Sequence, residues 1–185
     1  MELVKFNKLN KEILVIIRGI LSNLLNLFFT GIKLRRGVTV FGNVVVRTKF
    51  LPPYYKSKIF SRDHLRDLFD STSKYPVTMV KAGPGYGKSA YLTFGFRNKE
   101  NVFWYNVSKG DGDVLTFLIN LIYTFNTQDS EIGEKTLNFI KEKGETNQEW
   151  TPVLNSLINE LWDQYRYDEV YLIIGQFTGM IGDPT

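Results

Sequence analysis

The chain has 185 residues, 43% of them hydrophobic and 15% aromatic, which excludes a disordered protein and suits one domain with at most an appendage. It has no cysteine, which excludes disulfides and thiolate metal sites and is compatible with a cytoplasmic location. Its single histidine, His64, argues against a histidine-based metal site. Its net charge of +4 is uneven, since residues 1–50 carry nine Lys and Arg against two Asp and Glu, which predicts that this end contacts an anionic surface.

Residues 1–47 are expected to form a basic amphipathic helix followed by a short β segment. The run from Ile13 to Phe29 is strongly apolar, and at about 100° per residue the polar positions in and beside it fall within an arc of roughly 140°. Because the run contains Arg18, a full bilayer span is marginal. We expect contact with an anionic membrane surface through residues 1–36, with the basic stretch 33–36 at the headgroups. The alternative is a helix buried against a core or an oligomer partner.

The β segment from Gly37 to Val46 contains two glycines five positions apart. Together with the residues before it, this segment makes residues 1–46 resemble the N-terminus of a left-handed β-helix (hexapeptide) acyltransferase. One coil of a β-helix cannot bury its apolar face without stacked neighbours, and no further coils follow. We therefore expect no acyl transfer, and the catalytic histidine of that family has no counterpart here.

The paired prolines Pro52 and Pro53 favour an extended segment and mark the entry to a second domain, residues 48–174. A helix capped by Ser61 is expected to run through Phe69.

A strand at 77–80 is then expected to run into a glycine-rich turn and a helix that begins near Ala90. The turn matches the phosphate-binding pattern G-x-x-x-x-G-K-[ST], except that its first position is Ala82. In such a loop the backbone N–H groups and the start of the helix hold a phosphate. The residues expected to bind nucleotide are Ala82, Gly83, Pro84, Gly85, Tyr86, Gly87, Lys88 and Ser89.

Within this loop, Lys88 is expected to reach the β- and γ-phosphates and the Ser89 hydroxyl to ligate Mg²⁺. Gly83 and Gly85 are expected to supply backbone with positive φ. The alternative is a glycine-rich turn before a helix in a protein that binds no nucleotide.

The remaining elements alternate between apolar strands and amphipathic helices. Strands are expected at 102–107 and 169–174, and helices at 131–142, at 150–165 and from an Asp113 cap to Phe125. The core face of the last of these helices is Val114, Phe117, Leu118, Leu121 and Ile122. Asp111 and Asp113 favour a solvated turn with a helix cap over a Ca²⁺ loop, because the other ligands are missing. The order of elements predicts an α/β fold with a parallel sheet covered by helices on both faces.

Five short sequence motifs occur in the order typical of one protein family, namely Thr48–Pro53, Ser61-Arg62, Ala82–Ser89, Trp104–Val107 and Gly110–Asp113. With them, residues 48–174 resemble the ATP-binding domain of LuxR-type signal-transduction (STAND) NTPases, the maltose-regulon activator family. The resemblance implies a P-loop NTPase fold that binds ATP and Mg²⁺ as a conformational switch. It also implies a DNA-binding region further along the chain, which we do not expect within these residues.

In that family the third strand ends in two acidic residues that order Mg²⁺ and polarise the attacking water. Here the strand is followed by Gly175 and Gln176, and neither can replace a carboxylate. We therefore assign no catalytic residue and expect ATP binding with at most weak hydrolysis. The domain also lacks further parallel strands, which predicts an exposed sheet edge and self-association.

Residues 175–185 form a glycine-rich tail, and residues 171–185, which end Ile-Gly-Asp-Pro-Thr, resemble class I tyrosyl-tRNA synthetase. Neither of that family's two ATP-binding signatures is present. Because three unrelated resemblances meet at short joins, one hypothesis is a mosaic or designed α/β fold with no native function. The other alternative to nucleotide binding is a non-enzymatic membrane-associated or interaction protein.

Overall fold

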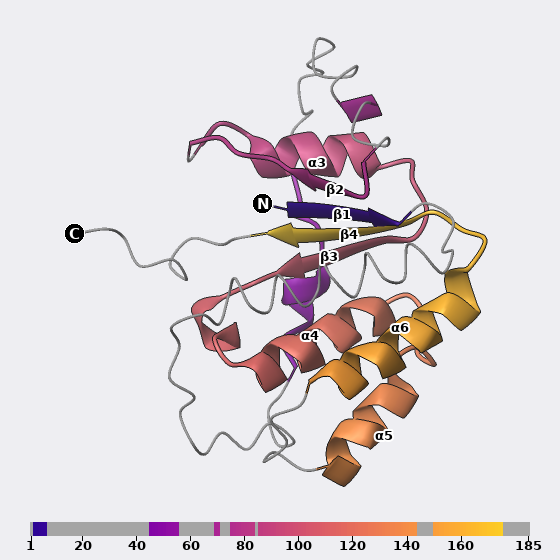
Figure 1. The fold of residues 1–185 in the computed structure, drawn as a ribbon. Helices are drawn as coiled ribbons and strands as arrows, with labels where there is room; N and C mark the ends of the chain where they lie inside the picture. Colours follow the sequence, from indigo (N-terminus) through magenta and orange to yellow (C-terminus); the bar gives the residue numbers. More distant parts are fainter. Residues whose placement is uncertain are drawn as a thin grey trace.

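A computed structural model describes residues 2–6, 45–55, 69–70, 75–83, 85–143 and 150–175, with backbone alone for residues 2–6 and 143 (Figure 1). The amphipathic helix expected over Ile13–Phe29, most of the β segment from Gly37, His64, most of the helix from Ser61, and the tail from 176 lie outside these residues. In the part of the chain that is described, no helix is long and apolar enough to cross a membrane.

The centre of the fold is a four-stranded sheet in the order β2-β1-β4-β3. The strands are β1 (Glu2–Phe6), β2 (Val77–Met79), β3 (Val102–Asn106) and β4 (Val170–Gly175). β3 and β4 are parallel, whereas β1 is antiparallel to both of its neighbours. β2 therefore runs in the same direction as β3 and β4, and these strands end at one edge of the sheet, which we call the carboxyl edge.

The expected parallel sheet is thus right for β3 and β4, whereas β1, from the segment expected to form an amphipathic helix, is an antiparallel strand between β2 and β4. Glu2 pairs with Met79 on one side and with Ile174 on the other, so β1 separates the strand before the glycine-rich loop from β4. The N-terminal residues supply backbone hydrogen bonds to two strands that would otherwise be edges.

Helices cover both faces of the sheet, as the element order predicts (Figure 1). α3 (Lys88–Phe96) lies on one face, and α4 (Val114–Asn126), α5 (Glu134–Lys143) and α6 (Thr151–Tyr165) lie on the other. Side chains of β3 and β4 alternate between the two faces. Trp104, Tyr171 and Ile173 pack with Leu92 and Phe96 of α3. The opposite core includes Phe103, Tyr105, Val170, Leu172 and Ile174 with the apolar positions of α4 and α6.

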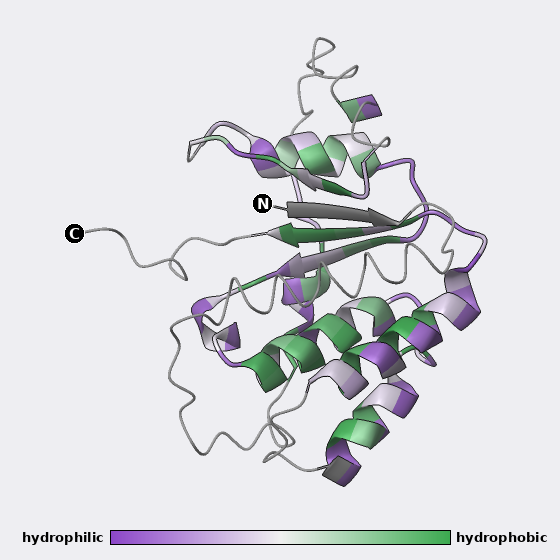
Figure 2. Cartoon of the chain, viewed as in Figure 1, coloured by the Kyte–Doolittle hydropathy of each residue, from purple (hydrophilic) through white to green (hydrophobic). Residues whose placement is uncertain are grey.

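α4 forms where its sequence pattern predicts it. The side chain of Asp113 accepts a hydrogen bond of 2.9 Å from the backbone N–H of Thr116, which caps the helix. Its expected core residues Phe117, Leu118, Leu121 and Ile122 are buried, and Val114 is half-buried. Figure 2 shows this hydrophobic side of the helix together with the apolar strands. These contacts fix β3 and β4 against a helical layer and so hold the carboxyl edge in place.

α5 begins at a carboxylate supplied by α6. Glu160, which is 9% exposed, accepts hydrogen bonds from the backbone N–H groups of Gly133 at 3.0 Å and Thr136 at 2.9 Å. The Thr136 hydroxyl also donates to Glu160. A negative charge at a helix start is favourable because the unpaired N–H groups point toward it. This buried contact holds the two helices together.

Candidate nucleotide site

The glycine-rich loop bends sharply between β2 and α3. Gly85 and Gly87 both have φ of 79°, a left-handed conformation that side chains with a Cβ rarely adopt. Positive φ at Gly85 agrees with the sequence analysis, whereas the second such glycine is Gly87 and not Gly83. Pro84 lies outside the described residues. The backbone therefore turns back on itself immediately before the helix.

Lys88 is the first residue of α3 and points its ammonium into this bend. Its Nζ donates hydrogen bonds to the carbonyl oxygens of Ala82 at 2.6 Å and Gly83 at 2.8 Å. An ammonium group has three donors, so one further donor remains for a ligand at the same point. The two ends of the loop are thus brought together around one positive charge.

Helix α3 presents the N–H groups of its first turn at the same place. Its N-cap residue is Gly87, which has no side chain to serve as a cap, and its first turn contains no acidic residue. The N–H of Tyr91 donates to the carbonyl of Gly87 at 2.8 Å, which closes the first helical turn. The N–H groups before it have no acceptor within the helix, which is the usual arrangement where a helix binds an anion.

The loop is accessible from solvent. Ala82, Gly83, Gly85 and Tyr86 are exposed, whereas Gly87, Lys88 and Ser89 are half-buried. The Tyr86 ring lies against Gly83, because a Cβ added there would be 3.1 Å from the ring atom Cε2. Tyr86 is nevertheless 70% exposed, so its ring packs beside the bend and does not bury it.

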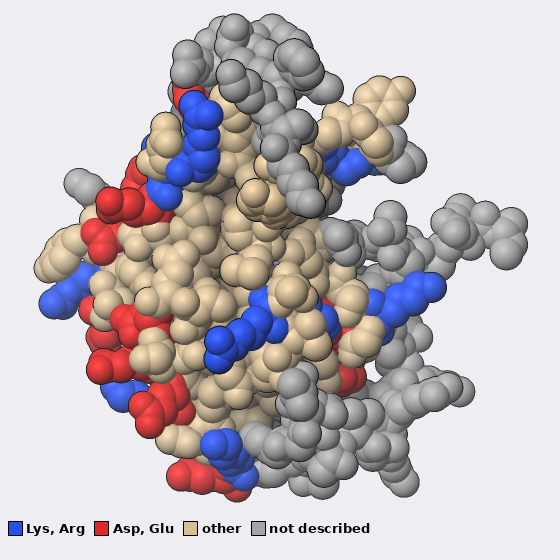
Figure 3. All heavy atoms as spheres, turned by 180° about the vertical axis from the view of Figure 1, so that it is seen from behind, with Lys and Arg blue, Asp and Glu red and all other residues tan. Residues whose placement is uncertain are grey.

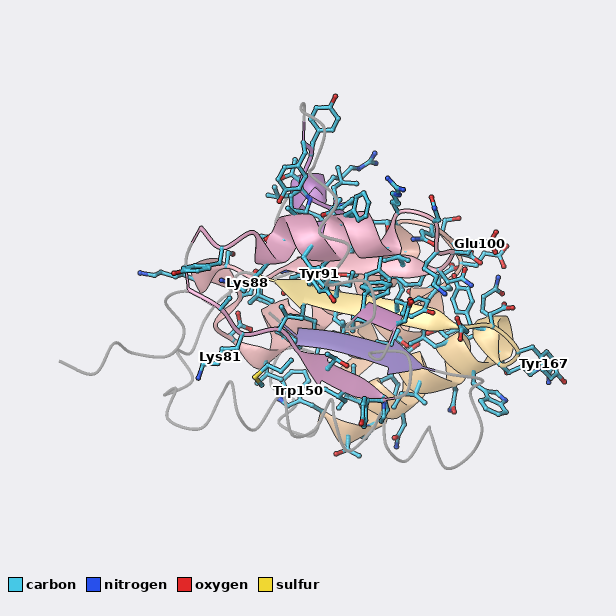
Figure 4. All side chains as sticks on the ribbon, turned by 90° about the horizontal axis from the view of Figure 1, so that it is seen from above. Lys81, Lys88, Tyr91, Glu100, Trp150 and Tyr167 are labelled. Carbon is cyan, nitrogen blue, oxygen red and sulfur yellow. The ribbon has the colours of Figure 1, made fainter. Side chains whose placement is uncertain are left out.

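The loop lies at the carboxyl edge of the sheet, where ligands of open α/β folds bind. Figure 4 shows Lys81 and Lys88 at one end of the molecule and Glu100 and Tyr167, which precede β3 and β4, at the other. In the rear view of Figure 3, the visible acidic side chains gather mainly at the end opposite the loop. Phosphate would therefore approach the less acidic end.

The neighbouring strand ends offer no carboxylate in the described residues. β4 has the sequence VYLIIG and ends at Gly175, one residue beyond the expected end at 174, and β3 ends at Asn106. The Gly175 carbonyl accepts a hydrogen bond of 3.0 Å from the N–H of Val107, which ties the two ends together. In the part of the chain that the structure describes, no group of three or more His, Cys, Asp or Glu could hold a metal ion.

Asp111 is buried, so the prediction of a solvated turn is wrong at this residue. Its side chain is fully buried and pairs with Lys49, and it also accepts hydrogen bonds from Asn120 Nδ2 at 2.9 Å and from Ser108. Ser108 and Asp111 form a capping box at the start of a short 3-10 helix, η4 (Lys109–Asp111). The S-x-x-D spacing is a sequence signal for this box, but Lys49 is too distant to be inferred.

Tyr55 is a second residue near the loop that the sequence analysis did not identify. Burial raises the pKa of Tyr55 above its usual value, and the nearby side chain of Ser89, the second residue of α3, opposes that rise. The hydroxyl is therefore protonated at neutral pH. No pattern in the sequence relates a tyrosine after two prolines to a residue thirty-four positions later.

A bend made by two glycines places the Lys88 ammonium and the start of α3 at the exposed carboxyl edge, and the Ser89 hydroxyl follows directly. In proteins, ammonium groups and helix starts are groups that hold phosphate, and a serine hydroxyl is an oxygen ligand of the kind that Mg²⁺ accepts. No protein-family model, no curated protein and no solved structure was found to match this chain.

Proposed function

We propose that this chain binds ATP with Mg²⁺ at residues 82–89 and hydrolyses it at most weakly. The observation that carries the proposal is the position of the Lys88 ammonium, which lies against the carbonyls of Ala82 and Gly83 beside the start of α3. Without an anion, loop carbonyls are the acceptors available to this charge. A phosphate would replace neutral acceptors by a charged one, which makes stronger hydrogen bonds.

The choice of ATP rests on the resemblance of residues 48–174 to STAND NTPases, in which nucleotide acts as a switch. The loop supports a nucleoside triphosphate because Lys88 and Ser89 occupy the positions that serve the β- and γ-phosphates and Mg²⁺ in the phosphate-binding pattern. Weak hydrolysis follows from β4, which ends without an acid to order Mg²⁺ or the attacking water.

The direct test is a titration of a fluorescent ATP analogue into the wild type and the Lys88→Ala variant in the presence of Mg²⁺. Loss of a charged hydrogen-bond donor to phosphate is expected to weaken binding by about ten- to a hundredfold. Lys81→Ala is the matched control, because Lys81 is exposed and precedes the loop at the same end of the molecule (Figure 4). Equal affinity of the wild type and Lys88→Ala would remove the proposal.

The excess of positive charge in residues 1–50 favours a second function, binding to an anionic membrane surface. Deleting residues 1–36 is an unsuitable test because it would remove β1 from the sheet. Replacing Lys33, Arg35 and Arg36 by Gln keeps β1. It should reduce cosedimentation with phosphatidylserine vesicles relative to phosphatidylcholine vesicles, and unchanged cosedimentation would contradict membrane binding through this segment.

A further inference from the structure

The two outer strands of the sheet differ in what lies along their outer edges. At the β3 edge, Gln128 Nε2 donates a hydrogen bond of 2.8 Å to the carbonyl of Val102, and Asn106 Nδ2 donates to the carbonyls of Lys49 at 3.2 Å and Leu51 at 3.0 Å. β2 is the last strand on the other side, and within the described residues it pairs with β1 alone (Figure 1). One edge of the sheet is therefore covered, whereas the other is open in this part of the chain.

β2 carries exposed apolar side chains on one face. Val77 is 38% exposed and Met79 is 63% exposed, and Tyr75, which precedes the strand by one residue pair, is 61% exposed. Val80 alternates to the other face and packs with the core beneath α3. An edge strand presents backbone N–H and C=O groups beside its side chains, and this is the arrangement by which a further strand is added to a sheet.

Two residues limit how far such pairing can extend. Pro76 precedes β2 and has no N–H to donate, and the exposed Lys81 follows Val80. Proline and lysine at the ends of an edge strand are common means by which proteins prevent unlimited addition of strands. Backbone pairing is therefore centred on residues 77–79. An interface of this size predicts a weak association, with a Kd of about 10–100 μM.

The β2 edge is complementary to itself. If two copies are related by a two-fold axis at Thr78, the middle residue of β2, their strands are antiparallel and Val77 of each lies opposite Met79 of the other. The same register places Lys81 of each copy opposite Tyr75 of the other, and an ammonium group over an aromatic ring is attractive. Lys81 is the one charged residue between 75 and 81, so no like charges face each other.

We propose that β2 is a self-association edge, at which the four-stranded sheets of two copies of this chain join by antiparallel pairing of β2 with β2. A second copy is favoured over an unrelated peptide because the pairing of apolar with apolar and of lysine with tyrosine is contained in this segment itself. Each copy contributes the same edge to a two-fold contact, so the assembly ends at a dimer. The inference does not rest on nucleotide binding.

Sedimentation velocity of the full chain from about 5 to 500 μM tests the dimer. The wild type is expected to pass from monomer to dimer over this range. Met79→Lys places a charge among the apolar side chains of the contact and should raise the Kd at least about tenfold. Tyr167→Lys is the matched control, because Tyr167 is 78% exposed in the turn before β4, and it should match the wild type. A wild type that stays monomeric throughout, or equal dimerisation of Met79→Lys, would overturn the proposal.

Introduced cysteines test the register, because the chain has none of its own. Residues directly opposite in antiparallel strands lie within the Cα separation that a disulfide requires, whereas residues offset by two positions do not. A mixture of Val77→Cys and Met79→Cys should therefore form at least about fivefold more cross-linked dimer under mild oxidation than either variant alone. Mass spectrometry identifies the dimer of unlike chains. Equal cross-linking in the mixture and in the separate variants would contradict antiparallel pairing of β2, and this readout needs no charged substitution in the strand.

Discussion

Lys49 forms an ion pair with Asp111, a fully buried residue sixty-two positions later in the chain. The pair fastens residues 49–51 to the turn after β3, where Asn120 and Ser108 also donate hydrogen bonds to the carboxylate. A buried carboxylate that loses its counter-charge is costly, because the remaining neutral donors do not compensate for lost hydration. The contact therefore matters more to stability than an ion pair on the surface.

Lys49→Met is expected to lower the free energy of unfolding by about 2–3 kcal/mol, because it leaves Asp111 buried without its counter-charge. Urea denaturation followed by circular dichroism measures the loss. Lys99→Met is the control: Lys99 and Glu169 approach at 3.9 Å with both side chains about half exposed, so its loss should stay below about 0.5 kcal/mol. Combining Lys49→Met with Asp111→Asn should cost less than the sum of the single changes. Equal losses in the two lysine variants would contradict the burial argument.

Gly133→Ala and Gly85→Ala should differ, although both glycines have positive φ, 88° and 79°. A Cβ at Gly133 would lie 2.1 Å from Cγ2 of Ile122 in the core, whereas a Cβ at Gly85 would meet nothing within 4 Å. Gly85→Ala should therefore cost about 1 kcal/mol of backbone strain, and Gly133→Ala about 3 kcal/mol because it adds overpacking. Thermal unfolding of both variants gives the comparison. Similar melting temperatures would show that the core near Ile122 yields more easily than its packing implies.

The free energy of unfolding should fall above pH 10, because buried tyrosines such as Tyr165 have raised pKa values in the folded protein. Burial, and then the charges of Asp129 and Asp168, raise the pKa of Tyr165 from 10.0 to about 12. A raised pKa means that the unfolded chain loses the proton first, so stability is complete below pH 10 and declines as the pH rises to about 12. Tyr165→Phe should reduce this decline by up to about 1.4 kcal/mol per pH unit.

The matched control for this pH dependence is Tyr167→Phe, since Tyr167 is 78% exposed and lies two positions away. Urea denaturation at several values between pH 9 and pH 12 measures both slopes. Tyr171 and Tyr105 also have raised pKa values through burial, so part of the decline should remain in Tyr165→Phe. Identical slopes for wild type and Tyr165→Phe would show that this hydroxyl does not titrate differently in the folded state.

Local patterns in the sequence were sufficient for most helices and for β3 and β4. The apolar period of α4 and the cap at Asp113 depend on residues close together in the chain, and the structure confirms both. β1 was missed because it is only five residues long and contains the charged residues Glu2 and Lys5. It therefore lacks the continuous apolar run by which a buried central strand is recognised. Its place depends on backbone pairing with residues about 75 and 170 positions later, which no local pattern reveals.

The same limit applies to the candidate site. The glycine-lysine-serine pattern correctly predicted where the chain bends, because backbone freedom is a property of the residue itself. The burial of Asp111 depends on Lys49, which comes from a distant part of the chain and meets Asp111 only after folding. Local sequence patterns therefore indicate the glycine bend and the helix after it, whereas contacts between distant segments, such as Lys49 with Asp111, leave no such pattern.

An acid at the end of β4 should restore hydrolysis if its absence is what limits turnover. Side chains at 171 and 173 face α3, and the alternation of a strand places position 175 on the same face, toward the side from which α3 and the loop extend. β4 lies two strand spacings from β2, roughly 10 Å, a distance that a carboxylate and a hydrated Mg²⁺ can span. Gly175→Asp with Gln176→Asp is therefore expected to raise phosphate release from ATP at least about tenfold.

Gly175→Asn with Gln176→Asn is the uncharged control of similar size, and circular dichroism shows whether both variants fold. Equal rates in the acidic and amide variants would mean that some other part of the site limits the reaction.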